Sequence, residues 1–154
     1  IELHNDPVVL RNMSDPNPIT IESHMKWWSR IKNDRHNERF IFCDGDVRLG
    51  FAKFIQIDFT NKNCLLGADI HKDYRGKGLA KPLWTMMLKR CFEMYDLHRV
   101  GLTTAEFNVV GQRVYASLGF KIEGIQPEFL LREGKYYDLR LMYLLKSDWE
   151  RANK

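Results

Sequence analysis

Residues 74–80, with the sequence Tyr-Arg-Gly-Lys-Gly-Leu-Ala, have the composition of an anion-binding turn. Gly76 and Gly78 let the backbone approach a ligand closely, because neither has a Cβ atom. Apolar residues spaced four apart follow and predict a helix, yet this turn offers no side chain that could cap it. The first N–H groups of that helix therefore lack partners and can bind an anion. With Arg75 and Lys77 adding positive charge, the pattern predicts a phosphate site.

Two better-known phosphate motifs do not fit this turn. A P-loop requires Ser or Thr after its Gly-Lys pair, and the residue after Gly76-Lys77 is Gly78. A dinucleotide fingerprint requires a third glycine where Lys81 stands. A glycine-rich turn between a strand and a helix, with no ligand, stays open as the structural alternative.

A second pair of polar side chains is spaced for one helix face. Asn108 and Tyr115 are seven residues apart, with Gly111 between them. On a helix this is about two turns, or roughly 10.5 Å, so one face presents an amide, a gap and a phenol. A core aromatic is the alternative for Tyr115.

A third set lies near the N-terminus and could contact a ring. Trp27 and Trp28 point about 100° apart on a helix, so at most one can face the core. The other, with His24 one turn earlier, could stack on a base or a sugar ring. A packing tryptophan beside a solvated histidine fits these residues equally well. The five histidines have no ligand spacing, so we expect no metal site.

These residues need a mixed α/β framework to bring them together. Hydrophobic periodicity predicts helices over residues 21–31, from Leu79 through Cys91 and over 108–118, the first capped by Thr20. It predicts strands over the ranges 39–43, 47–58, 64–71, 99–105, 120–123, 129–132 and 135–145. The first three strands should be antiparallel, and residues 64–105 should form a right-handed parallel crossover. Residues 11–20, with two prolines, are the loosest stretch.

Length and composition limit the possible classes of protein. A chain of 154 residues that is 44% hydrophobic has the size and core of a single domain. No apolar run reaches the roughly 20 residues of a membrane span. The net charge of +4 favours an anionic partner, and the three cysteines lack a disulfide pattern, so we expect them in the core of a cytoplasmic protein. A start at Ile1 indicates a trimmed N-terminus.

Both motifs resemble the GNAT N-acetyltransferases. Arg75, Gly78 and Ala80 match the Q/R-x-x-G-x-G/A acetyl-CoA motif of that family. Asn108, residues 114–120 and Gly124 are similar to its N-x(6)-Y-x-x-x-G-F-x-x-x-G ending. The resemblance covers residues 39–145 and includes the final hairpin, which is similar to that of spermidine and ribosomal-protein N-terminal acetyltransferases.

The resemblance implies an α/β acetyltransferase domain over 1–154, in which 39–145 bind acetyl-CoA and 1–38 form the acceptor side. It implies that backbone amides of 75–80 hold the pyrophosphate and that the strand near Asp69 pairs with the pantetheine arm. The implied cofactor contacts are Asp69, Ile70, His71, Arg75, Gly76, Lys77, Gly78, Leu79, Ala80, Asn108 and Tyr115.

In the family, the tyrosine at position 115 acts as general acid for the departing thiolate. Proton transfer from a phenol with a pKa near 10 to a thiolate with a pKa near 8.5 is uphill by ~2 kcal/mol, so a hydrogen bond can suffice. Relatives place a basic glutamate where Cys64, Leu65 or Thr103 stands here. The open candidates for the base are Glu106, Asp69, His71 and a water. We expect Tyr115, Asn108 and Glu106 to form the catalytic set.

The acceptor side lacks the acidic cluster that a polyamine would require. Residues 5–28 weakly resemble nucleotide-linked aminosugar N-acetyltransferases, which implies the 4-amino group of such a sugar as acceptor. A polyamine or a protein N-terminus is the alternative, and a basic nucleic-acid-binding module is the alternative of another class, although acids interrupt the basic residues throughout. We expect no membrane partner, and a homodimer as one possible assembly. The expected acceptor contacts are Arg11, Met13, His24 and Trp28.

Overall fold

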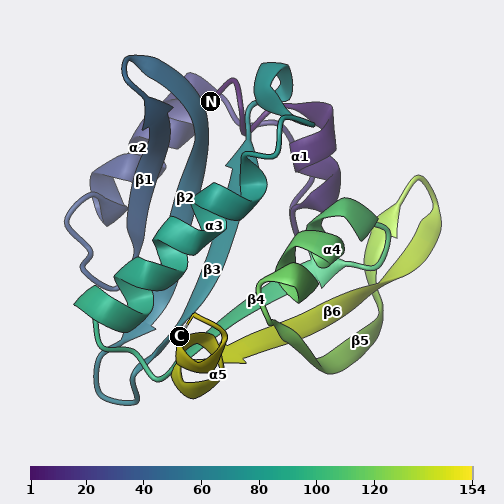
Figure 1. The fold of residues 1–154 in the computed structure, drawn as a ribbon. Helices are drawn as coiled ribbons and strands as arrows, with labels where there is room; N and C mark the ends of the chain where they lie inside the picture. Colours follow the sequence, from purple (N-terminus) through teal and green to yellow (C-terminus); the bar gives the residue numbers. More distant parts are fainter. Residues whose placement is uncertain (154) are drawn as a thin grey trace.

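A six-stranded sheet in the order β1-β2-β3-β4-β6-β5 organises the protein, and the computed structural model describes residues 1–153 (Figure 1). The strands are β1 Glu38–Asp44, β2 Val47–Asp58, β3 Asn63–Ile70, β4 Arg99–Ala105, β5 Lys121–Arg132 and β6 Lys135–Leu145. Only the β3–β4 pair is parallel. This confirms the predicted mixed sheet with its single parallel crossover.

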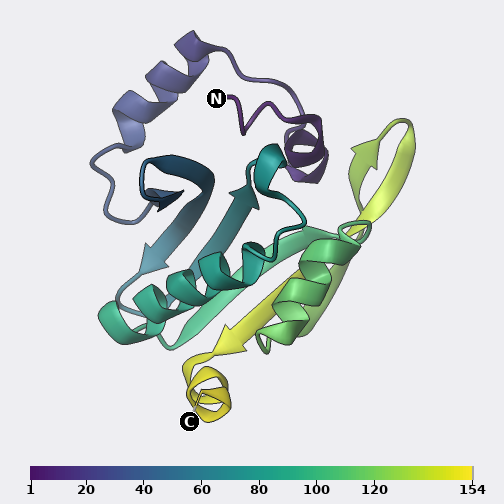
Figure 2. The same ribbon diagram turned by 45° about the horizontal axis from the view of Figure 1, so that its top comes forward.

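Helices cover both faces of this sheet (Figures 1 and 2). They are α1 Pro7–Asn12, α2 Ile21–Ile31, α3 Ala80–Lys89, α4 Val109–Ser117 and α5 Lys146–Ala152, with a short 3₁₀ helix at Lys72–Tyr74 and a π-helical turn at Arg90–Met94 that continues α3. α3 and α4 lie on one face, and α1 and α2 lie over the other. Within residues 1–153, no helix is both long enough and apolar enough to cross a membrane.

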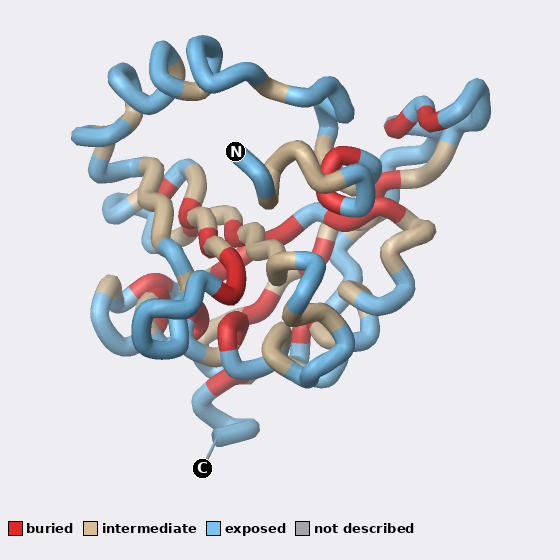
Figure 3. Tube along the Cα trace, turned by 90° about the horizontal axis from the view of Figure 1, so that it is seen from above, coloured by how far each residue is buried: buried red, intermediate tan, exposed pale blue. Residues whose placement is uncertain are grey.

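The main core lies between α3 and the sheet. Leu83, Met87 and Leu88 of α3 are buried against Phe54 of β2 and Val100 of β4. By contrast, α2 contributes no buried residue, and it lies as an exposed helix over the other face (Figure 3).

β3 and β4 remain paired over only a short length. Asn63–Leu65 pairs with Arg99–Gly101, and beyond these residues the two strands diverge (Figure 1). The rest of β3, including Asp69, therefore has no strand partner on its β4 side. A gap of this kind can accept an extended ligand that pairs with the backbone.

Several local predictions were wrong. The predicted strands 120–123 and 129–132 form one irregular strand, β5, which begins at Lys121 and whose pairing with β6 shifts between Gln126 and Leu130. The helix α1 was not predicted, although Asp6 caps it and a proline occupies its first position. Helix α5 was also missed. Cys64 and Cys91 are buried as expected, whereas Cys43 is exposed.

Candidate active site

The start of α3 forms an open cradle of backbone amides. Gly76 and Gly78 have φ of +75° and +76°, the left-handed region that favours glycine. A Cβ built on either glycine would meet nothing within 4 Å, so the space beside them is open. The N-cap residue Leu79 makes no side-chain hydrogen bond to the helix start. Unpaired N–H groups beside open space fit a pyrophosphate.

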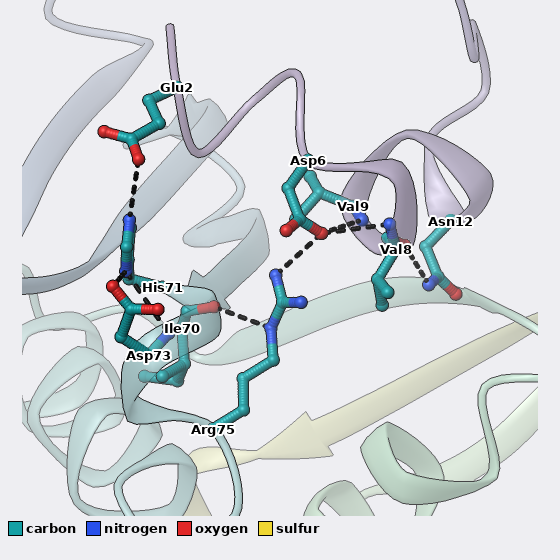
Figure 4. A network of polar contacts seen from close by, with 9 residues as sticks. All are labelled: Glu2, Asp6, Val8, Val9, Asn12, Ile70, His71, Asp73 and Arg75. Atoms are coloured by element: carbon teal, nitrogen blue, oxygen red, sulfur yellow. Dashed lines mark hydrogen bonds and ion pairs between the residues drawn. The ribbon is translucent and has the colours of Figure 1, made fainter.

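Arg75 contributes to this cradle differently from the prediction. Its guanidinium donates to the carboxylate of Asp6 at 3.0 Å and to the carbonyl of Ile70 at 3.0 Å (Figure 4). The same Asp6 oxygen accepts from the amide of Val8 at the start of α1. Arg75 therefore ties the N-terminal segment to the cradle. Lys77, whose ammonium lies 5.1 Å from the ring centre of Tyr74, is the exposed cation of the turn.

The side chain of His71 also has a structural role. Its Nδ1 accepts from the amide of Asp73 at 3.4 Å, and its Nε2 lies 3.4 Å from the carboxylate of Glu2 (Figure 4). One ring nitrogen therefore contacts the segment after β3, and the other contacts the N-terminal segment. The side chain of His71 is thus used for these contacts, and its cofactor contact stays a prediction.

Tyr115 is buried on α4 and packs edge-on against Trp84, with ring centres 4.8 Å apart. Burial, followed by the nearby charge of Asp69, raises the pKa of Tyr115 well above its ordinary value, while a hydrogen bond with Asn108 acts in the opposite direction. The phenol therefore keeps its proton at neutral pH. This environment suits a hydrogen-bond donor better than an acid that gives its proton away completely.

Asn108 is the N-cap of α4 rather than a residue on its face. Its Oδ1 accepts from the amide of Gly111 at 3.2 Å, and its Nδ2 donates to Thr104 Oγ1 at 3.0 Å. A Cβ on Gly111 would lie 2.5 Å from Asn108 Nδ2, which explains the glycine. Asn108 thus caps the helix that carries the phenol of Tyr115.

Among the candidates for the base, Glu106 makes a structural contact. Its carboxylate accepts from the amide of Asp138 on β6 at 3.2 Å. Asp69 lies on the part of β3 that has no pairing with β4, and burial raises the pKa of its carboxyl group. The structure thus favours Asp69 over Glu106 among the carboxylates considered. Within residues 1–153, no group of three or more His, Cys, Asp or Glu side chains could hold a metal ion.

The predicted acceptor residues separate into two places. Arg11 lies with its guanidinium 4.5 Å from the ring centre of Phe107, and the carbonyls of Arg11 and Met13 accept from the buried Arg132. These contacts dock α1 on the β5–β6 hairpin. His24 lies elsewhere, on α2, where its ring contacts that of Trp27.

Of the two tryptophans, Trp27 is the one whose ring contacts that of His24, whereas Trp28 was the expected acceptor contact. The rings of His24 and Trp27 are 5.4 Å apart, and the guanidinium of Arg39 on β1 lies 5.6 Å from the ring centre of Trp27. Trp28 is 38% exposed. It lines a shallow surface pocket with Phe40.

Sequence reasoning missed Lys53, Arg39 and His4 on this side of the sheet. Lys53 is half-buried in the middle of β2, opposite Arg39 on β1. Burial, then the Lys53 ammonium, lowers the pKa of His4. A lysine within the otherwise apolar run from Phe51 to Ile55 was the available signal.

The model of the acetyltransferase (GNAT) family matches residues 8–120, which is most of the chain. The protein belongs to the GNAT acetyltransferase family. It is therefore an enzyme that uses acetyl-CoA, and the non-enzymatic alternative falls away. The cradle at Gly76 and Gly78 and the divergence of β3 and β4 fit that acetyl donor.

Curated relatives of this acetyltransferase act, by name, on different amines. It is 29% identical over 118 residues to a spermidine N(1)-acetyltransferase of Vibrio cholerae, covering 76% of this chain and 68% of the relative. It is 29% identical over 124 residues to a putative ribosomal N-acetyltransferase of Bacillus subtilis, covering 80% and 67%. It is 27% identical over 152 residues to an L-amino acid N-acetyltransferase of Escherichia coli, covering 94% and 89%.

Solved structures share the fold of this acetyltransferase. The spermidine N-acetyltransferase from Vibrio cholerae, crystallised with CoA and spermine, superposes with a TM-score of 0.91 over 96% of this chain and 88% of that one, at 23% identity. At this identity the likeness establishes the fold. The expected aminosugar resemblance of the N-terminal third gains no support from these relatives.

Proposed function

We propose that this acetyltransferase moves the acetyl group of acetyl-CoA to the primary amine of a small molecule. The observation that carries the proposal is the uncapped start of α3, where Gly76 and Gly78 leave open space beside unpaired amides. Residues 75–80 would hold the pyrophosphate through their backbone. The free edge of β3 near Asp69 and Ile70 would pair with the pantetheine arm.

Tyr115 would donate a hydrogen bond to the sulfur atom that departs when the acetyl group moves. The high pKa of its phenol keeps the donor proton in place. Asn108 would act as a positioning residue, because it caps the helix that carries Tyr115. The amine must lose a proton during the transfer, and Asp69 or a water would accept it.

The class of acceptor is the finer part of the proposal. The relatives named for spermidine favour a polyamine over the nucleotide-linked aminosugar that the N-terminal third led us to expect. The acetyltransferase named for L-amino acids adds a third class of amine. A homodimer stays a prediction.

A turnover screen tests the proposal. Release of free CoA from acetyl-CoA would be measured with polyamines, amino acids, amino-sugar nucleotides and peptides with free N-termini. At least one small amine should accelerate release about tenfold or more above hydrolysis. Calorimetry with CoA alone should show binding, and the absence of both binding and turnover would refute the proposal.

A further inference from the structure

Two opposite charges lie on the α2 side of the sheet without contacting each other. Lys53 on β2 pairs with Gly67 on β3, and Phe51 pairs with Asp69. Because this register is regular, Lys53 and Asp69 project to the same face as diagonal neighbours about 7–8 Å apart. Burial lowers the pKa of Lys53, and the charge of Asp69 opposes that effect. Opposite charges spaced along one face can contact the two ends of a ligand that carries both an amine and an anion.

The conformation of Lys53 is set by the glycine opposite it. A Cβ on Gly67 would lie 2.2 Å from Lys53 Cε, so the lysine stem occupies the space that a larger residue would fill. The side chain therefore runs from β2 across β3. This direction leads toward the place where β3 and β4 diverge, beside Asp69.

Besides Asp69, the charge that acts on Lys53 is the cation Arg39. Arg39 lies opposite it on β1, with its guanidinium held by the carbonyl of Phe54 at 3.1 Å. His4 is close enough for the Lys53 ammonium to lower its pKa, and the charge of His24 acts in the same direction. An anion beside Lys53, Arg39 and His4 would therefore be attracted, and Asp69 is the opposite charge available to an amine.

Asp69 connects this charged face to the reaction centre. The charges of Lys53 and Arg75 lower the pKa of its carboxyl group against the larger effect of burial. Its own charge raises the pKa of Tyr115. An amine beside Asp69 would therefore lie near Tyr115, and the remainder of the acceptor would extend toward Lys53.

We propose that the acceptor is a primary amine that carries a carboxylate or a phosphate a few bonds away, and that Lys53 binds this anion while Asp69 faces the amine. The inference rests on the proposed acetyl transfer and narrows its acceptor. α-Amino acids and phosphate-bearing amino sugars share this chemistry. Spermidine does not, because its further amines are positively charged. The inference thus ranks an anionic amine above the polyamine that the names of the relatives favour.

Matched pairs of acceptors test the inference on the unaltered enzyme. Leucine would be compared with leucinamide, and glucosamine 6-phosphate with glucosamine, with spermidine as a separate arm. The anionic member of at least one pair should have a kcat/KM about tenfold or more above its neutral partner. The pair with the larger ratio identifies carboxylate or phosphate as the anion.

Substitution of Lys53 then assigns the preference to that residue. Lys53→Met keeps an unbranched side chain over Gly67 and should lower kcat/KM for the anionic acceptor about tenfold or more, through KM. The neutral partner should stay within about twofold. Lys53→Arg should retain most of the preference. Lys89→Met, which removes an exposed lysine at the end of α3, should change neither acceptor.

The outcomes separate this inference from the proposed function. Equal use of both members of each pair by the unaltered enzyme, or a preference for spermidine, would overturn the anion inference while leaving acetyl transfer intact. A preference that survives in Lys53→Met would overturn the role of Lys53. Failure of every amine to release CoA would instead contradict the proposed function.

Discussion

The two faces of the sheet carry helices of opposite character. Leu83, Trp84, Met87 and Leu88 of α3 are buried in the main core, whereas α2 has no buried residue. The cradle for the acetyl donor begins on the buried helix, and two of the expected acceptor contacts, His24 and Trp28, lie on the exposed one, α2 (Figure 3). The cofactor side thus depends on backbone shape that the core holds fixed. The acceptor side depends on side chains that can change without disturbing the core.

The same contrast separates the acetyl donor, which the relatives share, from the acceptor, which differs among them. Relatives of this protein that are named for spermidine, for ribosomal protein and for L-amino acids all belong to acetyltransferases. One donor site can serve many acceptors if recognition of the acceptor lies outside the core. The contacts between Arg75 and Asp6 and between His71 and Glu2 are the links by which the N-terminal segment reaches the donor side (Figure 4).

The largest expected effect concerns the donor side. Gly78→Val places a β-branched residue at φ +76° and a side chain in the open space of the cradle, so CoA affinity should fall about 100-fold or more. Titration calorimetry with CoA measures this. The control is Gly45→Val, which meets a similar strain at φ +54° in the β1–β2 turn and should leave the affinity within about twofold. Equal CoA affinities of the Gly78→Val and Gly45→Val variants would contradict the assignment of the cradle as the pyrophosphate site.

Much of this donor side could be predicted from the sequence. β2 and β4 have the bounds that alternation and apolar character predict, at Val47–Asp58 and Arg99–Ala105. The glycines of the cradle were found because a left-handed backbone restricts the choice of residue. β5 was divided in two because its irregular pairing includes Pro127, which interrupts the strand pattern.

The acceptor side was harder to predict for a physical reason. Lys53, Gly67 and Asp69 share a face only because β2 and β3 pair in one particular register, and spacing along the chain does not reveal that register. In the structure, Trp27 and not the expected Trp28 contacts Arg39. Arg39 lies on β1, so the sequence of α2 alone does not reveal this contact. Charges that meet across strands require the fold before they can be recognised as a group.

A smaller effect is expected at the reaction centre. Tyr115→Phe keeps the ring that packs on Trp84, so CoA affinity should stay within about twofold, while kcat should fall about 10- to 100-fold because a transition-state hydrogen bond is lost. Steady-state kinetics and calorimetry separate the two. Tyr95→Phe, which removes a hydroxyl bonded to Glu38 and Arg90 at the other side of the core, should change kcat by less than twofold.

The pH dependence of the same step follows from the direction of the shift. Because burial and Asp69 raise the pKa of Tyr115 above the ordinary value near 10, its proton is present at every pH below that value. Ionisation of Tyr115 should therefore cause no decline in kcat below about pH 10. If kcat of the unaltered enzyme declines below pH 10 while the low residual kcat of Tyr115→Phe does not, the raised pKa of Tyr115 would be contradicted.

The smallest effect compares the stability of the two sides directly. Thr20→Ala removes the cap of α2, in which Thr20 Oγ1 accepts from the amide of Ser23 at 3.1 Å. This should cost about 1 kcal/mol locally, so amides of α2 should exchange roughly fivefold faster. The melting temperature of the whole protein should barely change, because α2 buries no residue. Asn108→Ala removes the cap of α4, which carries the buried Tyr115, and should lower the melting temperature by several degrees. Equal losses from both substitutions would mean that α2 unfolds together with the core, and the contrast between a fixed donor side and an adaptable acceptor side would no longer hold.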